Sequence, residues 1–268
     1  MNIEMILTFE ANPVALSLGP LQIHWYAIMY IMGFLAAYFS LRTSHNTLKL
    51  SKGAIQDWLN ISIFSVLIGG RLGYVFFYHW DYYKEHVVNI FYIWEGGMAF
   101  HGALIGLFIS SYLFLKYHKA AIWRGFDLLS LAATPGLFFG RIGNFINSEL
   151  VGRPTQGNWG VVFSQVDGVA RHPSQLYEAC FEGLLLGLFL YLIYTVIKPK
   201  PGILASLFLI CYANSRFFIE FFREPDPQLG LLMFQFSLGQ YLSLVMFATG
   251  LFCLFYFTYQ PKKRGPSL

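Results

Sequence analysis

Residues 237 to 259 read SLGQYLSLVMFATGLFCLFYFTY and contain no Asp, Glu, Lys, Arg or His. A bilayer core needs about 20 predominantly apolar residues in one helix, so this stretch predicts a membrane-spanning helix. The composition of the whole chain agrees. Only 12% of the 268 residues are charged and 56% are hydrophobic, whereas a soluble domain typically has about 25% charged residues. The sequence is that of a membrane protein, and a soluble globular domain is excluded.

Other stretches have a similar length and apolar character. The predicted spans are residues 22–41, 58–78, 97–115, 126–147, 175–197, 203–222 and 237–259. We find no internal repeat or linker, so we predict an all-α bundle of about seven transmembrane helices that forms a single integral-membrane domain over residues 1–268. The N-terminal sequence MNIEMILTFEANP has neither a basic region nor a small-residue cleavage site. We therefore expect no cleaved signal peptide.

The basic residues between the spans predict the orientation. One side carries eleven of them, namely Arg42, Lys49, Lys52, Lys116, Lys119, Arg124, Lys198, Lys200, Lys262, Lys263 and Arg264. The other side carries four: Lys84, Arg153, Arg171 and Arg223. Because Lys and Arg accumulate in cytoplasmic loops, the N-terminus is predicted to lie outside and the C-terminus in the cytoplasm.

Three arginines, Arg71, Arg141 and Arg216, fall inside predicted spans. Arginine in hydrocarbon costs several kcal/mol or more, so it normally faces the bundle interior or a wet cavity. Any one of them is equally compatible with a structural ion pair or a snorkelling side chain. Three in one bundle favour a shared anion site instead.

The neighbours of two of these arginines are polar too. In LFFGRIGNFINSELVGRP, residues 137 to 154, Asn144 and Asn147 follow Arg141 at helical spacing. In YANSRFFIEFFREPD, Tyr212 and Glu220 flank Arg216 at spacings of four, and an i,i+4 ion pair would hold Arg216 in place. Two guanidinium groups that converge from different helices suit a phosphate.

Other candidate residues are less specific. His101, at the start of the third span, is a candidate base, although a lone histidine there is more often structural. Glu149 and Arg153 form either a solvated loop pair or part of the site. Glu178 and Glu182, at i and i+4 in the fifth span, have no obvious local cation.

Cys180, Cys211 and Cys253 lie in apolar runs without paired spacing, which predicts neither a disulfide framework nor a zinc site. We expect no metal and no cofactor.

Several blocks together resemble a known family. The segment GRIGNFINSELVGRP closely matches the signature of bacterial phosphatidylglycerol–prolipoprotein diacylglyceryl transferases. The segments HWYAIMY, GGRLGYVFFY, GGMAFHGALIG, RHPSQLYEA and SRFFIEFFREPD are similar to the family's other blocks, in the family's order. The resemblance covers nearly the whole chain.

The resemblance implies a reaction. Such enzymes transfer the diacylglyceryl group of phosphatidylglycerol to the lipobox cysteine thiol in a prolipoprotein signal peptide, which forms a thioether and releases glycerol phosphate. It also implies a multi-pass protein of the bacterial cytoplasmic (inner) membrane, with its active site toward the outer, periplasmic side, and no nucleic-acid partner. By similarity the catalytic residues are His101, Arg141 and Arg216. The substrate-binding candidates, from the resemblance and from the residues themselves, are Tyr26, Arg71, Asn144, Glu149, Gly152, Arg153, Tyr212 and Glu220.

Two other classes of protein remain open on the residues alone. A membrane transporter for an anionic solute also uses intramembrane Arg and Glu. Against it, the polar residues gather toward the outer half of the spans and no inverted repeat is visible. A non-catalytic scaffold would leave the buried arginines without a purpose.

Overall fold

The structure is a computed structural model that describes residues 5–10, 12–19, 21–92, 96–155, 157, 159–224 and 233–259. It is mostly helical, and a helix coincides with each predicted span. The long helices are α1 (Trp25–Thr43), α3 (Lys52–Phe77), α5 (Phe100–Tyr117), α6 (Ile122–Ile146), α9 (Ile203–Ile219) and α10 (Leu238–Tyr259). The fifth predicted span is a continuous helix made of α7 (Ser174–Glu178), η3 (Ala179–Leu185), α8 (Leu186–Leu192) and η4 (Ile193–Ile197). Short helices are α2 (His45–Leu48), α4 (Trp80–Tyr83), η1 (Val87–Phe91) and η5 (Met233–Gln235).

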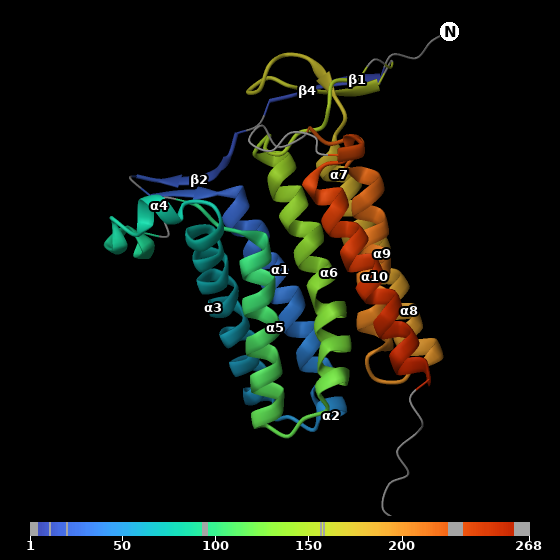
Figure 1. The fold of residues 1–268 in the computed structure, drawn as a ribbon. Coiled ribbons are helices and arrows are strands. Elements are labelled where there is room, and N and C mark those ends of the chain that lie inside the picture. Colours follow the sequence, from blue (N-terminus) through green and yellow to red (C-terminus); the bar gives the residue numbers. More distant parts are fainter. Residues whose placement is uncertain are drawn as a thin grey trace, which may run out of the picture. The chain divides into compact units, whose positions relative to one another are not determined.

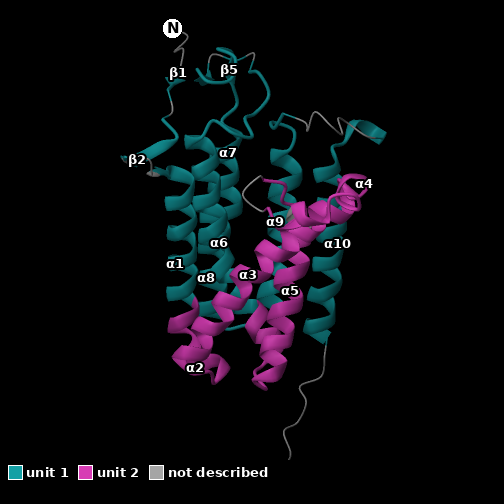
Figure 2. Ribbon diagram, turned by 90° about the vertical axis from the view of Figure 1, so that its left-hand side faces the viewer, with its two compact units in different colours: residues 1–40, 127–268 teal, residues 41–126 magenta. Residues whose placement is uncertain are grey.

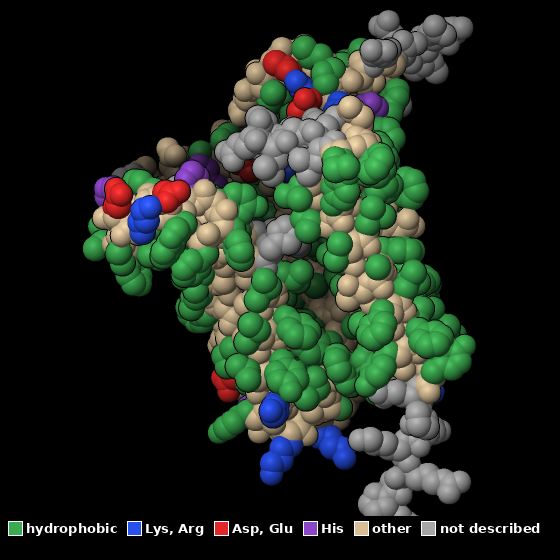
Figure 3. Space-filling view, viewed as in Figure 1, with side chains coloured by type: hydrophobic (Ala, Val, Ile, Leu, Met, Phe, Trp, Pro, Cys, Tyr) green, Lys and Arg blue, Asp and Glu red, His purple; other side chains and the backbone are tan. Residues whose placement is uncertain are grey.

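Three of these helices are long and apolar enough to cross a membrane: Lys52–Phe77, Ser174–Ile197 and Leu238–Tyr259. Gly102–Tyr117 and Ile203–Ile219 are shorter apolar helices. Large hydrophobic side chains such as Phe64 on α3 and Phe252 on α10 are exposed, and Figure 3 shows hydrophobic side chains over the helix flanks. Such flanks suit a lipid environment. The predicted helical membrane protein is confirmed, while the number of spans and the side of each terminus stay predictions.

Short strands occur outside the long helices, which the all-α prediction did not include. Strand β1 (Met5–Phe9) pairs in parallel with β4 (Trp159–Phe163), and β5 (Ala170–Arg171) pairs antiparallel to β4. Strands β2 (Val14–Leu18) and β3 (Leu21–His24) form an antiparallel hairpin. The first helix therefore begins at Trp25 and not at residue 22. Strands of two to five residues in so apolar a sequence have no period that separates them from the start of a helix.

The chain divides into two compact units (Figure 2). Unit 1 comprises Met1–Ser40 and Asp127–Leu268, and unit 2 comprises Leu41–Phe126. The prediction of a single membrane domain stays a prediction.

Unit 2 is built on the close approach of α3 and α5. A Cβ atom added at Gly73 would lie 2.8 Å from the Cα of Gly102, and one added at Gly106 would meet the carbonyl of Ser65. Small residues at such positions let two membrane helices pack backbone to backbone. Trp58 on α3 donates a buried hydrogen bond to Ser111 on α5 (Nε1 to Oγ, 3.1 Å).

Unit 1 packs α6 against its neighbours at glycines. A Cβ added at Gly33 of α1 would lie 3.1 Å from the Cα of Gly136 on α6, and one added at Gly183 would lie 2.7 Å from the Cα of Phe138. In the views of Figure 1 the three-stranded sheet lies beyond the α7 end of these helices. This glycine packing brings α6 and the helix from Ser174 to Ile197 close enough for their polar side chains to meet.

Side chains fix the beginnings of α9 and α10. The buried carboxylate of Asp127 accepts hydrogen bonds from the backbone N–H groups of Gly202 and Ala205, each at 3.0 Å. At α10, Ser237 and Gln240 form a capping box, in which each side chain accepts from the other residue's backbone N–H. These caps satisfy donors that the first turn of a helix leaves without partners.

Candidate functional site

A buried set of charged residues lies in unit 1, where α6, α7, η3 and α9 meet at one end of their helices. We call it the Arg–Glu cluster: Arg141, Arg216, Arg223, Glu178, Glu182 and Glu220. The predicted convergence of Arg141 and Arg216 from different helices is confirmed. Charged groups at such positions are rare in membrane proteins and mark substrate or ion sites.

Glu178 is the centre of the cluster. Its side chain is fully buried, and its two oxygens face different arginines. Arg141 Nε lies 3.1 Å from Oε2, and Arg216 Nη1 donates a hydrogen bond to Oε1. Arg223 Nη1 lies 3.5 Å from the same Oε1. One carboxylate therefore orients three guanidinium groups, which a flexible surface pair does not do.

Glu220 holds Arg216 from the other side. The predicted i,i+4 ion pair is present, with Arg216 Nη2 2.6 Å from Glu220 Oε2. The other oxygen, Oε1, accepts a hydrogen bond from Ser237 Oγ at 2.9 Å. Because Ser237 also caps α10, the start of that helix helps to fix Arg216.

Glu182 lies one turn beyond Glu178, in the π-helical segment η3. It is fully buried, yet the described residues give neither of its carboxylate oxygens a hydrogen bond. Its nearest cationic atoms are Arg141 Nη2 and Arg216 Nη1, both at 3.8 Å. π-Helical turns of this kind often occur at functional sites.

The signature loop that follows α6 is tied to Glu149. Asn144 Nδ2 and Asn147 Nδ2 each donate to one carboxylate oxygen of Glu149, at 3.4 Å. Gln175 Nε2 donates to the backbone oxygen of Glu149 at 2.7 Å. Since Gln175 belongs to α7, this hydrogen bond joins the signature loop to the helix that carries Glu178.

Gly152 and Arg153 anchor the same loop to the end of α9. Arg153 donates twice there, from its backbone N to Phe222 O and from Nε to Arg223 O, both at 2.9 Å. A Cβ added at Gly152 would lie 2.7 Å from Phe222 O and would also collide with His172 O. The residue must therefore be glycine for the two segments to approach this closely.

Arg171 closes the loops over this end of unit 1. It donates to Gly152 O at 2.8 Å and forms ion pairs with Glu224 at 2.9 Å and Asp167 at 2.6 Å. These hydrogen bonds from Arg171 hold the pKa of the exposed Asp167 carboxyl below its usual range. Burial lowers the pKa of the neighbouring His172, so the ring is neutral near pH 7.

Two predicted tyrosines also lie in unit 1. Tyr212 is buried on α9, one turn before Arg216, and its ring stacks on Phe208. Tyr26 on α1 lies against α6, because a Cβ added at Gly143 would be 3.2 Å from its ring. Its hydroxyl is 2.7 Å from that of Tyr30. Tyr26 therefore packs on α6 at Gly143, which lies between Arg141 and Asn144 in the sequence.

Arg71 lies in unit 2, where it forms hydrogen bonds with the backbone. Its side chain is buried and donates to the backbone oxygens of Ile90 (2.8 Å) and Asn89 (2.6 Å) and to that of Gly96. The guanidinium also lies 5.2 Å from the centre of the Tyr83 ring. These contacts are with backbone oxygens, so they are neither the ion pair nor the snorkelling arrangement weighed as alternatives. The substrate-binding role of Arg71 stays a prediction.

His101 also belongs to unit 2, where the backbone of α5 begins at Phe100. The side chain of His101 lies outside the part of the chain that the structure describes. Its assignment as the base stays a prediction.

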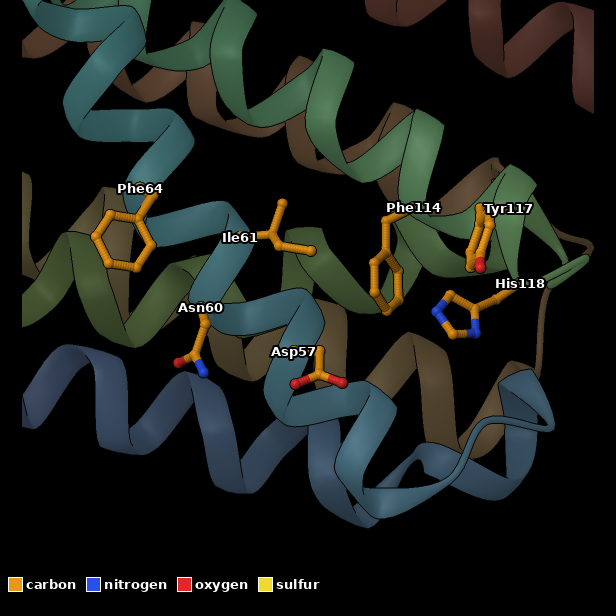
Figure 4. A pocket seen from close by; sticks show the side chains of 7 residues that line it. All are labelled: Asp57, Asn60, Ile61, Phe64, Phe114, Tyr117 and His118. Atoms are coloured by element: carbon orange, nitrogen blue, oxygen red, sulfur yellow. The ribbon is translucent and has the colours of Figure 1, made fainter.

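A separate groove of about 440 Å³ lies between α3 and α5 of unit 2. Figure 4 shows Asp57 and Asn60 on α3 and His118 just after α5 among the residues that line it. Its remaining walls are Ile61, Phe64, Phe114 and Tyr117. None of these residues was predicted to belong to a site.

Sequence reasoning omitted Glu178, Glu182 and Arg223 from the predicted site. The first two stood out only as buried acids without a local cation, and their cations come from α6 and α9. Arg223 was counted as a loop residue, although its side chain reaches Glu178. The available signal was that two acids one turn apart in an apolar helix require partners elsewhere.

Comparison with known proteins identifies the family. The family of prolipoprotein diacylglyceryl transferases matches residues 13–256. The chain belongs to this family. Among curated relatives, the phosphatidylglycerol–prolipoprotein diacylglyceryl transferase of Oleidesulfovibrio alaskensis is 45% identical over 90% of this chain and 91% of its own. The enzyme of the same name from Geobacter sulfurreducens is 45% identical over 90% and 93%. That of Bordetella parapertussis is 44% identical over 95% and 98%.

Proposed function

We propose that this chain is a phosphatidylglycerol–prolipoprotein diacylglyceryl transferase that uses the Arg–Glu cluster to bind the phosphate of the lipid. The observation that carries the proposal is the pair Arg141 and Arg216, which share the buried carboxylate of Glu178. Their side chains keep 18% and 14% of their surface exposed, so neither arginine is fully enclosed. A phosphodiester is the kind of group that such donors bind.

The reaction named for the family is compatible with this placement. The cysteine sulfur of the prolipoprotein attacks the glycerol carbon that bears the phosphate, the new C–S bond forms and the C–O bond breaks. The bonding electron pair leaves on the phosphate oxygen, so glycerol phosphate is released with an added negative charge. Fixed guanidinium groups in a water-poor site stabilise that charge, which is commonly the largest contribution to catalysis.

The thiol must lose its proton for the attack, because thiolate is the reactive form. We assign this step to His101, which matches the essential histidine that the resemblance implies. Asn144, Glu149, Gly152 and Arg153 shape the loop beside the cluster, and Tyr26 lies next to it. The buried atoms Asn147 Oδ1 and Ser148 Oγ have no hydrogen-bond partner among the described residues, which suits a loop that receives a polar substrate.

We further propose seven membrane spans within one membrane domain, an outside N-terminus, a cytoplasmic C-terminus and residence in the bacterial inner membrane. The cluster then opens toward the periplasmic side, where a prolipoprotein presents its lipobox cysteine. Arg153 and Arg223, both counted for the outer side, contact each other at the cluster's end of unit 1. Their contact is consistent with the assignment of both residues to one side of the membrane. A transporter of anionic solutes is not favoured, since the relatives carry the names of transferases.

The test compares lipid donors. Purified protein is incubated with a lipobox peptide and either phosphatidylglycerol or phosphatidylethanolamine, and the diacylglyceryl mass on the cysteine is measured. Product should form from the anionic lipid, with the zwitterionic lipid a poor donor because its ammonium opposes the arginines. Equal turnover of both lipids would refute the anion requirement.

A further inference from the structure

Glu182 differs from the other two acids of the cluster. Glu178 and Glu220 each have a guanidinium nitrogen within 3.1 Å of one oxygen and a hydrogen bond on the other. Glu182 has neither among the described residues, and its nearest arginine nitrogens are 3.8 Å away. An ionised carboxylate that is fully buried without a hydrogen bond is costly, and a bound proton removes that cost.

The net charge of the cluster depends on whether Glu182 is ionised or protonated. Three arginines against three ionised glutamates leave no net charge. With Glu182 protonated, three positive charges face two negative charges, and the cluster carries a single positive charge. The headgroup of phosphatidylglycerol carries one net negative charge, whereas the choline ammonium of phosphatidylcholine cancels the charge of its phosphate. The protonated cluster therefore matches the charge of phosphatidylglycerol, whereas the ionised cluster has no positive charge to offer.

We propose that Glu182 takes up a proton when the anionic headgroup of the lipid binds to Arg141 and Arg216. This inference rests on the proposed function, since it concerns the same site. The phosphate replaces Glu182 as the second anion near both guanidiniums, and the carboxyl group, now neutral, remains buried beside them. Glu178 and Glu220 keep their charges because their direct partners stay in place.

The surroundings of Glu182 agree with this assignment. Arg141 faces it from α6, and Arg216 and Tyr212 face it from α9. Glu178, on the preceding turn, and Arg223, after α9, are the other charged neighbours among the described residues. Glu178 repels a second negative charge next to it, and a bound phosphate adds a third anion. Protonation of the carboxylate that lacks hydrogen bonds relieves this repulsion most directly.

The experiment counts protons during lipid binding. Titration calorimetry of the full chain in detergent is run at pH 8 in two buffers with different ionisation enthalpies, with phosphatidylglycerol or phosphatidylcholine as the ligand. The wild-type protein should take up about one proton with phosphatidylglycerol and none with phosphatidylcholine. Glu182→Gln and Glu182→Met, which cannot ionise, should bind phosphatidylglycerol without proton uptake, with an affinity that changes little with pH. Two replacements are used so that the failure of one to fold does not remove the test.

Glu224→Gln is the matched control, because Glu224 is an exposed carboxylate outside the cluster that pairs with Arg171. It should take up a proton as the wild-type chain does. Binding of phosphatidylglycerol without proton uptake, or unchanged uptake in both Glu182 variants, would overturn the inference. The same samples are assayed for lipidated peptide. If product forms without proton uptake, the role of Glu182 is refuted and the proposed transferase stands. If lipid binds with proton uptake but no product forms, the proposed transferase is refuted and Glu182 remains the proton acceptor.

Discussion

At the scale of single residues, Arg141 and Arg216 are held in place by the two oxygens of Glu178 before any substrate arrives. Preorganised donors need no rearrangement when charge develops on the leaving group. The same geometry makes each arginine sensitive to replacement by lysine. A guanidinium is a planar fork that can donate to Glu178 along one edge and to a phosphate along another. The compact ammonium group of lysine cannot reproduce this geometry.

Arg141→Lys and Arg216→Lys should therefore each lower kcat/KM for lipid transfer. Loss of one charged hydrogen bond is worth about 1.5–3 kcal/mol, which corresponds to a rate roughly 10- to 150-fold lower. Initial rates with varied phosphatidylglycerol provide the measurement. Lys84→Arg, at an exposed ion pair in unit 2, is the control and should keep its rate. Arginine variants as active as this control would show that the planar fork is unnecessary.

His101→Gln should have a different defect. If His101 removes the proton of the thiol, the residual rate of this variant should rise between about pH 6.5 and 9, as more thiol ionises without help. The rates of the arginine variants should rise with pH no more than the wild-type rate does, because their defect concerns the leaving group. A His101→Gln rate that stays near zero across this range argues against a simple base. Loss of lipid binding in the same variant would make His101 a positioning residue.

At the scale of secondary-structure elements, α9 depends on a cap from another helix. Asp127, in α6, accepts hydrogen bonds from two N–H groups in the first turn of α9 and places a negative charge at the positive end of the helix. Because Arg216 lies in the last turn of α9, a cap that stabilises the start of this helix also helps to position Arg216 in the cluster.

Asp127→Ala should lower the free energy of unfolding by about 0.5–2 kcal/mol, the usual range for loss of an N-cap. Thermal unfolding in detergent, followed by circular dichroism, measures the change. Ser51→Ala removes the cap of α3, where Ser51 Oγ accepts from Ala54 N at 3.0 Å, and should give a shift of the same sign. An unchanged unfolding midpoint for Asp127→Ala would contradict the capping role.

The long helices were predictable because each needs only a sustained apolar run, such as residues 237–259. The strands were not. Residues 21–24 pair with residues 14–18, and a pairing partner cannot be read from so short an apolar segment. The ion pair of Arg216 with Glu220 was predictable from its i,i+4 spacing. The pairs with Glu178 and Glu182 were not, because they depend on which faces of three separate helices meet.

At the scale of the whole molecule, the topology is the main untested prediction. The loops with an excess of Lys and Arg are predicted to be cytoplasmic, and the cluster is predicted to lie at the opposite face of the membrane. A cysteine-free background is needed for labelling, and Cys180, Cys211 and Cys253 have no assigned role in the site. Replacement of all three by serine should leave most of the activity.

In this background, single cysteines are introduced at Lys119 and at Asn158, the latter outside the described residues. An impermeant thiol reagent applied to intact cells should label position 158 and leave position 119 unmodified until the cells are opened. The reverse pattern would invert the orientation and place the cluster on the cytoplasmic side.

The central claim is that a carbon–oxygen bond to phosphate breaks while a thioether forms on the substrate cysteine. The most direct measurement is mass analysis of all products from the cysteine-free chain, phosphatidylglycerol and a lipobox peptide. We predict a peptide whose diacylglyceryl group stays attached to sulfur in neutral hydroxylamine, an equal amount of glycerol phosphate, and no lipid on the enzyme. A hydroxylamine-labile acyl thioester, or a peptide that retains the phosphate, would contradict the account.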